Sequence, residues 1–333
     1  MTTFEGGRSS TYEKTGGPFF ESKRSLRGVT SEDVLHWTEN LILPHQPFGE
    51  ITDNFWALYG LDGVVGSLGL NYELPAFGPT PVLTRLKEQG LLDENIMGLY
   101  LGELQGNTSA SDVSASGELT IGGLNTNRYK GRHGLHWQNT VHPGRWAVGL
   151  SKILVDWEFQ KPKTMPEEII IELESDYTLR KANNNTPRTH VIHVDRHTDD
   201  PDVLKPVPIY PDPDSLYMSL PSKHARELNR VLGIPATSEN AYGISGCSQF
   251  DWGELPHVGF LISGTIYWLE PEDYLLRNAR HLPDKCYGMI DGHGSQGLEE
   301  DTDEGAILGI MFLVKFFSAF DFENHRVGFA LAA

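Results

Sequence analysis

Cysteine is scarce in this sequence, with Cys247 and Cys286 as the two cysteines among 333 residues. Two thiols fit no zinc-binding spacing, and the residues alone leave open whether they are free or paired. Long apolar runs are also lacking. The most apolar segment, AILGIMFLVKFFSAF, is interrupted by Lys315 and is shorter than the roughly 20 residues that a membrane-spanning helix needs. We therefore expect no membrane partner.

Basic residues are in the minority: 27 Lys and Arg stand against 45 Asp and Glu, which gives a net charge of −18. This charge makes nucleic acid and anionic membranes poor partners. The start of the sequence, MTTFEGGRSSTYEKTGG, lacks the apolar stretch of a signal peptide. Apolar residues make up 39%, with 35 Gly and 20 Pro, which is typical of a loop-rich globular protein. Nothing in the sequence indicates an oligomeric state.

Helical periodicity is rare, and it predicts short helices at Pro81–Leu92 and Ser222–Gly233. Most other patterned segments read as short strands separated by Gly and Pro turns. Paired apolar runs around Ser263-Gly264 and around Asn324-His325 predict two β-hairpins. Many short strands with few helices favour an all-β fold.

One region differs from the rest. Residues 159–211 are polar and charged, and we interpret them as a long insertion with one strand, in THVIHVD. Within it, His193, Asp195 and His197 share one face of a strand, which is a possible metal-binding pattern. We disfavour a metal because the cluster is short and lies in the insertion. The run Gly292–Gly297 formally matches a nucleotide-binding loop, but no strand precedes it and acidic residues follow, so we expect no cofactor.

Several segments, in the right order, resemble the pepsin-like aspartic protease family. They cover most of the chain outside the insertion: FEGGRSSTYEKTGGPF, NLILPHQPFGEIT, LDGVVGSLGL, PVLTRLKEQGLLDENIMGLYLGE, GELTIGGLNTNRYKGRHGLHW, ELPHVGFLISGTIYWLEPEDYLL and AILGIMFLVKFFSAFDFENHRVGFALA.

The resemblance implies a bilobal all-β fold that acts on peptides or proteins. We expect an incomplete N-terminal lobe at residues 1–140 and a C-terminal lobe at 141–333 that carries the insertion. Family members join two cysteines that flank the segment between Cys247 and Cys286, so we favour a disulfide over two buried thiols. The bond would close a loop of about 40 residues and stabilise the fold by roughly 3–4 kcal/mol. The family is secreted or enters the secretory pathway, although no signal peptide is written here.

Hydrolysis by this family needs two carboxylates that share one proton and therefore titrate apart. The resemblance places Asp212 at the second catalytic position, with Pro213 at the Thr or Ser position and Asp214 at the Gly position. Proline has neither an N–H nor a hydroxyl, and Asp214 adds like charge beside Asp212. We therefore expect Asp212 to be the remnant of a catalytic group. Asp195 is a rival for this position, but it lacks the Leu-Pro-helix sequence that follows Asp212.

Other parts of the family pattern are changed or kept. No Asp-Thr-Gly-Ser occurs in the sequence, so we expect the first catalytic carboxylate to be absent together with the first strands of its lobe. In the flap, Lys23-Arg24 stand where the family has Tyr-Gly. This change has two interpretations. The basic pair gives the cleft a preference for an acidic ligand, or, as we favour, the segment is simply a solvated loop. The two segments that cross the active-site loops, Val64-Val65-Gly66 and Ile307-Leu308-Gly309, are retained.

Three functional hypotheses follow. The chain is an aspartic endopeptidase by descent whose catalysis is impaired, a non-catalytic pseudoprotease that binds a peptide or another ligand in the inherited cleft, or an enzyme of different chemistry on the same scaffold. The sequence identifies neither the substrate nor the pathway.

Overall fold

The computed structural model describes residues 5–21, 26–39, 41–53, 66, 68–71, 79–102, 117–130, 134–142, 144–157, 172–173, 189–197, 204–237, 242–249, 251–277, 285–292 and 305–333. Strands dominate these residues and helices are few and short, so the predicted all-β class is confirmed. Among the same residues, no helix has both the length and the apolar character required to cross a membrane.

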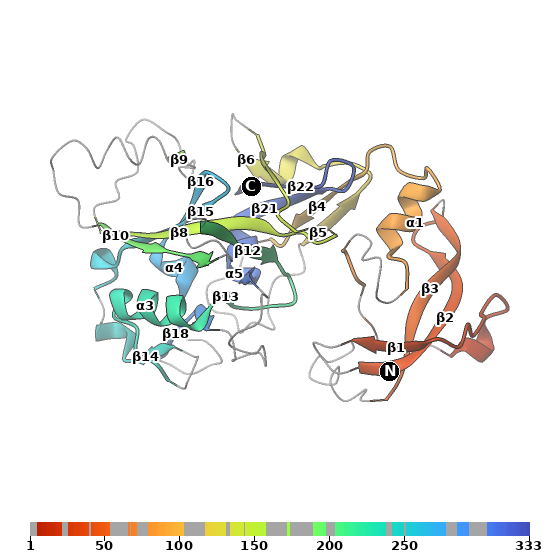
Figure 1. The fold of residues 1–333 in the computed structure, drawn as a ribbon, viewed down its shortest axis with the longest axis horizontal. Coiled ribbons are helices and arrows are strands. Elements are labelled where there is room, and N and C mark those ends of the chain that lie inside the picture. The colour runs from red at the N-terminus through yellow and green to blue at the C-terminus, as the bar shows by residue number, and fades with distance from the viewer. Residues whose placement is uncertain are drawn as a thin grey trace. The chain divides into compact units, whose positions relative to one another are not determined.

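The chain divides into two compact units, Met1–Asn95 and Ile96–Ala333. Within the first unit, the described residues form an antiparallel sheet of three strands in the order β1-β2-β3 and one α-helix (Figure 1). Its elements are η1 (Gly6–Arg8), β1 (Pro18–Glu21), β2 (Leu26–His36), β3 (Ile42–Asp53) and α1 (Val82–Glu88).

Helix α1 packs on β3 through its apolar face, because Val82, Leu83 and Leu86 are buried. The side chain of Arg85 donates a hydrogen bond to the Pro44 carbonyl at 3.1 Å, which also ties the helix to β3. The helix ends before Gly90, which has a φ of 62°. The helix predicted from this segment is therefore confirmed.

The described residues of the second unit form three sheets. Its strands are β4 (Ile96–Tyr100), β5 (Glu118–Ile121), β6 (Tyr129–Lys130), β7 (His136–Asn139), β8 (Val148–Asp156), β9 (Glu172–Leu173), β10 (Thr189–His193), β11 (Asp195–His197), β12 (Leu204–Pro211), β13 (Met218–Leu220), β14 (Gly243–Ser245), β15 (His257–Ile262), β16 (Thr265–Leu269), β17 (Leu275–Arg277), β18 (Lys285–Gly288), β19 (Ile290–Gly292), β20 (Ala306–Leu308), β21 (Phe316–Asp321) and β22 (Arg326–Ala332).

Its helices are η4 (Thr126–Arg128), α3 (Ser222–Leu232), η5 (Cys247–Gln249), η6 (Trp252–Glu254), α4 (Pro271–Tyr274) and α5 (Ile310–Lys315). Helix α3 confirms the second predicted helix and ends at Gly233, whose φ is 71°. Helix α5 was not predicted, because its apolar residues continue an apolar run that reads as a strand.

The largest sheet has the strand order β19-β13-β20-β12-β8-β15-β16-β9, and β10 and β11 are added alongside β8 and β12. The sequence predicted one strand in the polar segment 159–211, whereas β9 to β12 all lie there. Strand β10 is the predicted one and pairs with β8. Of the others, β9 and β11 are only two and three residues long, and β12 contains three prolines, so each carries a weak strand signal and depends on pairing with its neighbours.

A second sheet joins distant parts of the chain in the order β5-β4-β21-β22-β6, with β7 also paired to β22 (Figure 1). Residues 96–139 therefore belong to the same compact unit as the C-terminal strands. The lobe boundary predicted after residue 140 stays a prediction. The third sheet, β14-β18-β17, carries the disulfide between Cys247 and Cys286, whose Cα atoms lie 5.5 Å apart. The predicted disulfide is confirmed.

Both predicted hairpins are present. Strands β15 and β16 are joined by Ser263 and Gly264, whose φ values of 46° and 88° are those of a two-residue type I′ turn. Strands β21 and β22 pair from Asp321 and Arg326 outwards, with a four-residue connection. These strands line a core of aromatic rings in which Tyr267 lies 5.3–5.9 Å from three phenylalanine rings: Phe312, Phe316 and Phe329.

Candidate active site

Asp212 follows directly on β12, at the start of the turn that leads to β13. Strand β12 is held on both sides, by β8 in antiparallel and by β20 in parallel pairing. Its residues Val207 and Ile209 are buried, which fixes the strand in the sheet. Asp212 itself is partly exposed. The core therefore positions a carboxyl group where it remains accessible to a ligand.

Main-chain hydrogen bonds tie the Asp212 turn to the segment Ile307-Leu308-Gly309 that passes beneath it. The Asp212 N–H donates to the Leu308 carbonyl at 3.0 Å, and the Ile310 N–H donates to the Ser215 carbonyl at 2.7 Å. Both bonds hold the turn from the same crossing segment. The structure therefore shows the crossing that the sequence predicted for Ile307-Leu308-Gly309.

Glycine is required at position 309 because the two segments approach closely. A Cβ atom on Gly309 would lie 2.1 Å from the Tyr217 carbonyl oxygen and 2.6 Å from the Ser215 carbonyl oxygen. Both distances are far inside van der Waals contact. Since these two oxygens belong to the turn itself, any side chain here would displace the loop that carries Asp212.

Hydrogen bonds within the turn set the orientation of Asp212. The Asp214 N–H donates to Asp212 Oδ1 at 2.9 Å, and the Ser215 N–H donates to the Asp212 carbonyl at 3.2 Å. The Ser215 hydroxyl donates to the Tyr217 carbonyl at 3.0 Å. We expected Pro213 to remove the hydrogen bonds that support the Asp212 carboxylate. Residue 213 indeed offers neither an amide N–H nor a hydroxyl, but the N–H of Asp214 still donates to that carboxylate.

A buried polar pair lies beneath the turn. The Ser219 hydroxyl on β13 donates to Asp291 on β19, and both side chains are buried. On α3, the Asn229 amide donates to the Ile290 carbonyl at 3.0 Å, so the helix is also fastened to β19. Sequence reasoning missed Asp291. The signal in the sequence is an acidic residue directly after the apolar pair Met289-Ile290, because a carboxylate buried among apolar residues needs a hydrogen-bond donor.

Asp195, the rival of Asp212, lies on the neighbouring strand β11. It pairs with Pro206 across β11 and β12. Pro206 is five residues before Pro211, so the main chain at Asp195 is about 16 Å from the start of the Asp212 turn at 3.3 Å per residue. The structure therefore does not bring Asp195 to the turn. Among the residues it describes, there is also no cluster of three or more His, Cys, Asp or Glu side chains that could hold a metal.

The segment assigned to the flap forms a hairpin. Strands β1 and β2 pair in antiparallel register from Pro18 opposite Val29 to Glu21 opposite Leu26. Lys23 and Arg24 fall between these strands, outside the described residues. Of the first crossing segment, Val64 and Val65 are likewise outside the described residues.

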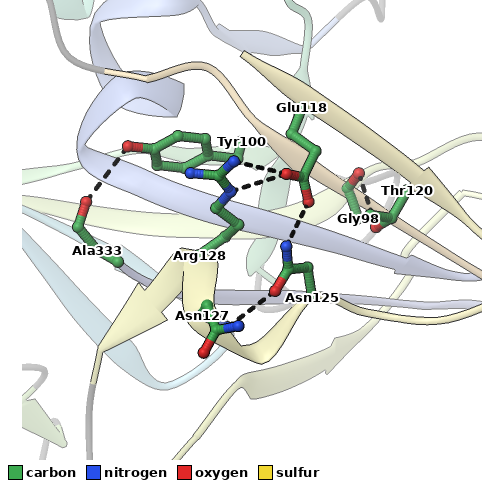
Figure 2. Close-up of polar contacts among 8 residues, drawn as sticks. All are labelled: Gly98, Tyr100, Glu118, Thr120, Asn125, Asn127, Arg128 and Ala333. Carbon is green, nitrogen blue, oxygen red and sulfur yellow. Dashed lines mark hydrogen bonds and ion pairs between the residues drawn. The ribbon is translucent and has the colours of Figure 1, made fainter. Parts of the chain in front are cut away.

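The motif GELTIGGLNTNRYKG forms a polar network on the second sheet (Figure 2). Arg128 Nε and one terminal nitrogen both donate to Glu118, at 2.9 and 2.7 Å, and Asn125 donates to the other carboxylate oxygen at 2.8 Å. The Arg128 bonds, with that of Asn125, lower the pKa of Glu118. The guanidinium also lies 4.9 Å above the Tyr100 ring, whose hydroxyl donates to the Ala333 carbonyl. These contacts join β5 to η4 and so stabilise this part of the sheet.

The fold, the crossed Asp turn and the disulfide define an aspartyl protease architecture. Comparison with protein families shows the same class: residues 1–170 and 212–332 match the family described as "Eukaryotic aspartyl protease", and the chain belongs to it. The match leaves out residues 171–211, which lie within the predicted insertion.

Individual relatives are moderately similar. The chain is 26% identical to pregnancy-associated glycoprotein 1 of Ovis aries, over 99% of this chain and 70% of the relative. It is 25% identical to renin of Canis lupus familiaris, over 99% of this chain and 68% of the relative. It is also 26% identical to cathepsin D of Homo sapiens, over 99% of this chain and 70% of the relative.

Proposed function

We propose that this protein is an aspartic endopeptidase homologue that binds peptide or protein segments at the Asp212 turn and hydrolyses them poorly or not at all. The observation that carries the proposal is the turn itself. The turn is hydrogen-bonded to Leu308 and closely approached by Gly309, as its fold requires. The three residues at the positions that carry the family's chemistry are Asp212, Pro213 and Asp214.

The impairment rests on what an acid–base pair requires. Two carboxylates must share one proton so that one is base and the other acid at the same pH. Pro213 supplies neither hydroxyl nor amide to a neighbouring group, and it is exposed. Asp214 is also exposed and places a second acidic residue close to Asp212, where the family has a glycine. Both changes weaken the reaction and leave the turn folded.

Ligand binding depends on different features, and these are present. Asp212 is partly exposed, and its Oδ1 is oriented by the Asp214 N–H. A preorganised carboxylate can accept a hydrogen bond from a peptide N–H or from a hydroxyl, and such charge-assisted bonds are the stronger class. Peptides and proteins are therefore the proposed ligands. An oxidising compartment, as in the secretory pathway, is the proposed location because the Cys247–Cys286 disulfide persists there.

Binding is tested with a peptide whose scissile bond is replaced by a hydroxyl-bearing, non-hydrolysable group. Isothermal titration calorimetry should show binding to the wild type, and Asp212→Asn should weaken it about 10- to 100-fold, the equivalent of one charged hydrogen bond. Asp251→Asn is the matched control, since Asp251 is an exposed aspartate that also accepts a backbone N–H two residues on. Absent binding in the wild type contradicts the proposal, and equal binding in Asp212→Asn shows that the ligand does not contact the turn.

A further inference from the structure

The segment Ser9–Glu13 in the first unit is held against the sheet by side chains that donate to carboxylates. Ser9 Oγ donates to Asp33 Oδ1 at 2.9 Å, and Thr11 Oγ1 donates to the same oxygen at 2.5 Å. Asp33 lies on β2, more than 20 residues further along the chain. We call Ser9–Glu13 the strap. The carboxylate clasp is the set of side-chain contacts that hold the strap, from Ser9 and Thr11 to Asp33 and from Tyr12 to Glu50.

A second carboxylate holds the other end of the strap. The Tyr12 hydroxyl donates to Glu50 Oε2 on β3 at 2.7 Å, and the Ser31 hydroxyl on β2 donates to the same oxygen at 3.0 Å. Ser31 is completely buried. The main chain adds two bonds, because Glu13 and Glu32 exchange N–H to carbonyl bonds of 2.9 and 2.8 Å. All three strap side chains in the clasp therefore end on carboxylate oxygens.

Asp33 is the carboxylate of the clasp that holds both Ser9 and Thr11. A single oxygen, Oδ1, accepts from Ser9, from Thr11 and from the Val34 N–H at 2.7 Å. Bonds to an ionised carboxylate are about twice as strong as neutral ones. The Thr11 bond is the largest cause of a lowered Asp33 pKa; burial opposes it, while the Val34 N–H, Ser9 and the charge of His36 support it. The strap and the ionised form of Asp33 therefore stabilise each other.

We propose that the clasp is an acid-released latch: when Asp33 takes up a proton, the strap leaves β2. Because the pKa of folded Asp33 is below its ordinary value, the ionised clasp contributes stability above the ordinary Asp pKa of about 3.9. That contribution is lost as the pH falls through the folded value. The latch is therefore closed at neutral pH and opens in strongly acidic medium.

Neighbouring groups do not replace the charge of Asp33. Opposite it on β3 is Gln46, an uncharged side chain whose amide donates to the Pro47 and Thr80 carbonyls. Glu32, one residue along β2, faces the other side of the sheet and binds His45 at 3.0 Å. The charge of His36, on the same strand, also lowers the pKa of Asp33.

Hydrogen exchange of the full chain tests the latch. The reporters are the amides of Glu13 and Glu32, and the reference is β21, where Ala319 is fully buried. After correction for intrinsic rates, exchange at the reporters should rise severalfold between pH 6 and pH 3, while β21 remains protected. Unchanged reporter exchange in the wild type overturns the proposal, and so does equal loss of protection in β21, because the strap would then open only by global unfolding.

Two variants separate the latch from general instability. Asp33→Asn keeps an acceptor oxygen but removes the charge, so its reporter amides should exchange faster at pH 6 and change less than about twofold on acidification. The double variant Ser9→Ala, Thr11→Val removes the donors and should behave in the same way. Asp251→Asn should retain the wild-type response. A wild-type pH response in Asp33→Asn overturns the proposal.

Discussion

Gly309→Ala is the substitution that most directly perturbs the Asp212 turn without changing its chemistry. The added methyl group would lie 2.1 Å from the Tyr217 carbonyl oxygen and 2.6 Å from the Ser215 carbonyl oxygen. Ordinary contact needs more than 3 Å, so the crossing segment or the turn must move by about 1 Å. The turn resists this movement because Asp212 and Ser215 are both bonded to the crossing segment.

The expected cost combines two terms. Overpacking a close-packed site costs about 1–3 kcal/mol, and losing one or two main-chain hydrogen bonds adds about 1 kcal/mol each. The total of about 2–5 kcal/mol corresponds to a fall in Tm of roughly 2–4 °C per kcal/mol for a unit of this size. We therefore expect a decrease of roughly 4–20 °C.

Differential scanning calorimetry measures this decrease. Gly123→Ala is the matched control, because nothing lies within 4 Å of a Cβ at Gly123 and its Tm should stay within about 2 °C of the wild type. A Gly309→Ala variant that melts together with Gly123→Ala would refute the close crossing beneath the turn.

Two further perturbations act on the second unit. Replacing Cys247 and Cys286 by serine should lower its stability by about 3–4 kcal/mol, and thiol titration of the denatured, unreduced wild type should find no free thiol. Asp321 is buried, which raises its pKa, but hydrogen bonds from Asn324 and Arg326 outweigh this and lower it overall. Asp321→Asn should therefore cost about 1.5–3 kcal/mol in urea unfolding at pH 7, and the difference from the wild type should shrink below about pH 4. A difference that grows on acidification would contradict this sign.

The sequence predicts those parts of the fold whose local signal agrees with the tertiary structure. The Ser263-Gly264 turn is one example, since Gly264 readily adopts the positive φ that a tight hairpin needs. Helix α3 is another, with its apolar face and Gly233 at its end. The Asp212 turn was located through the family resemblance, and the bonds from Leu308 and Asp214 could not be read from spacing alone.

Other features depend on contacts between distant residues. Helix α5 lies in an apolar run, and it is the crossing at Gly309 that sets its start. Strand β11 is polar and forms because it can pair with β12. The clasp joins Thr11 to Asp33, and no local pattern marks that pair. In each case the deciding interaction is a tertiary one.

Acidic hydrolysis of a protein substrate is the measurement that tests the account's central claim most directly. The wild type and Asp212→Asn are assayed side by side, with and without a transition-state-mimicking inhibitor of aspartic proteases. We predict no inhibitor-sensitive cleavage by either protein, because Pro213 and Asp214 stand where the turn of a working carboxylate pair needs a hydroxyl and a glycine, and changes within a catalytic unit remove several orders of magnitude in rate. Inhibitor-sensitive cleavage by the wild type that disappears in Asp212→Asn would show that Asp212 is a working catalytic carboxylate and would contradict the account.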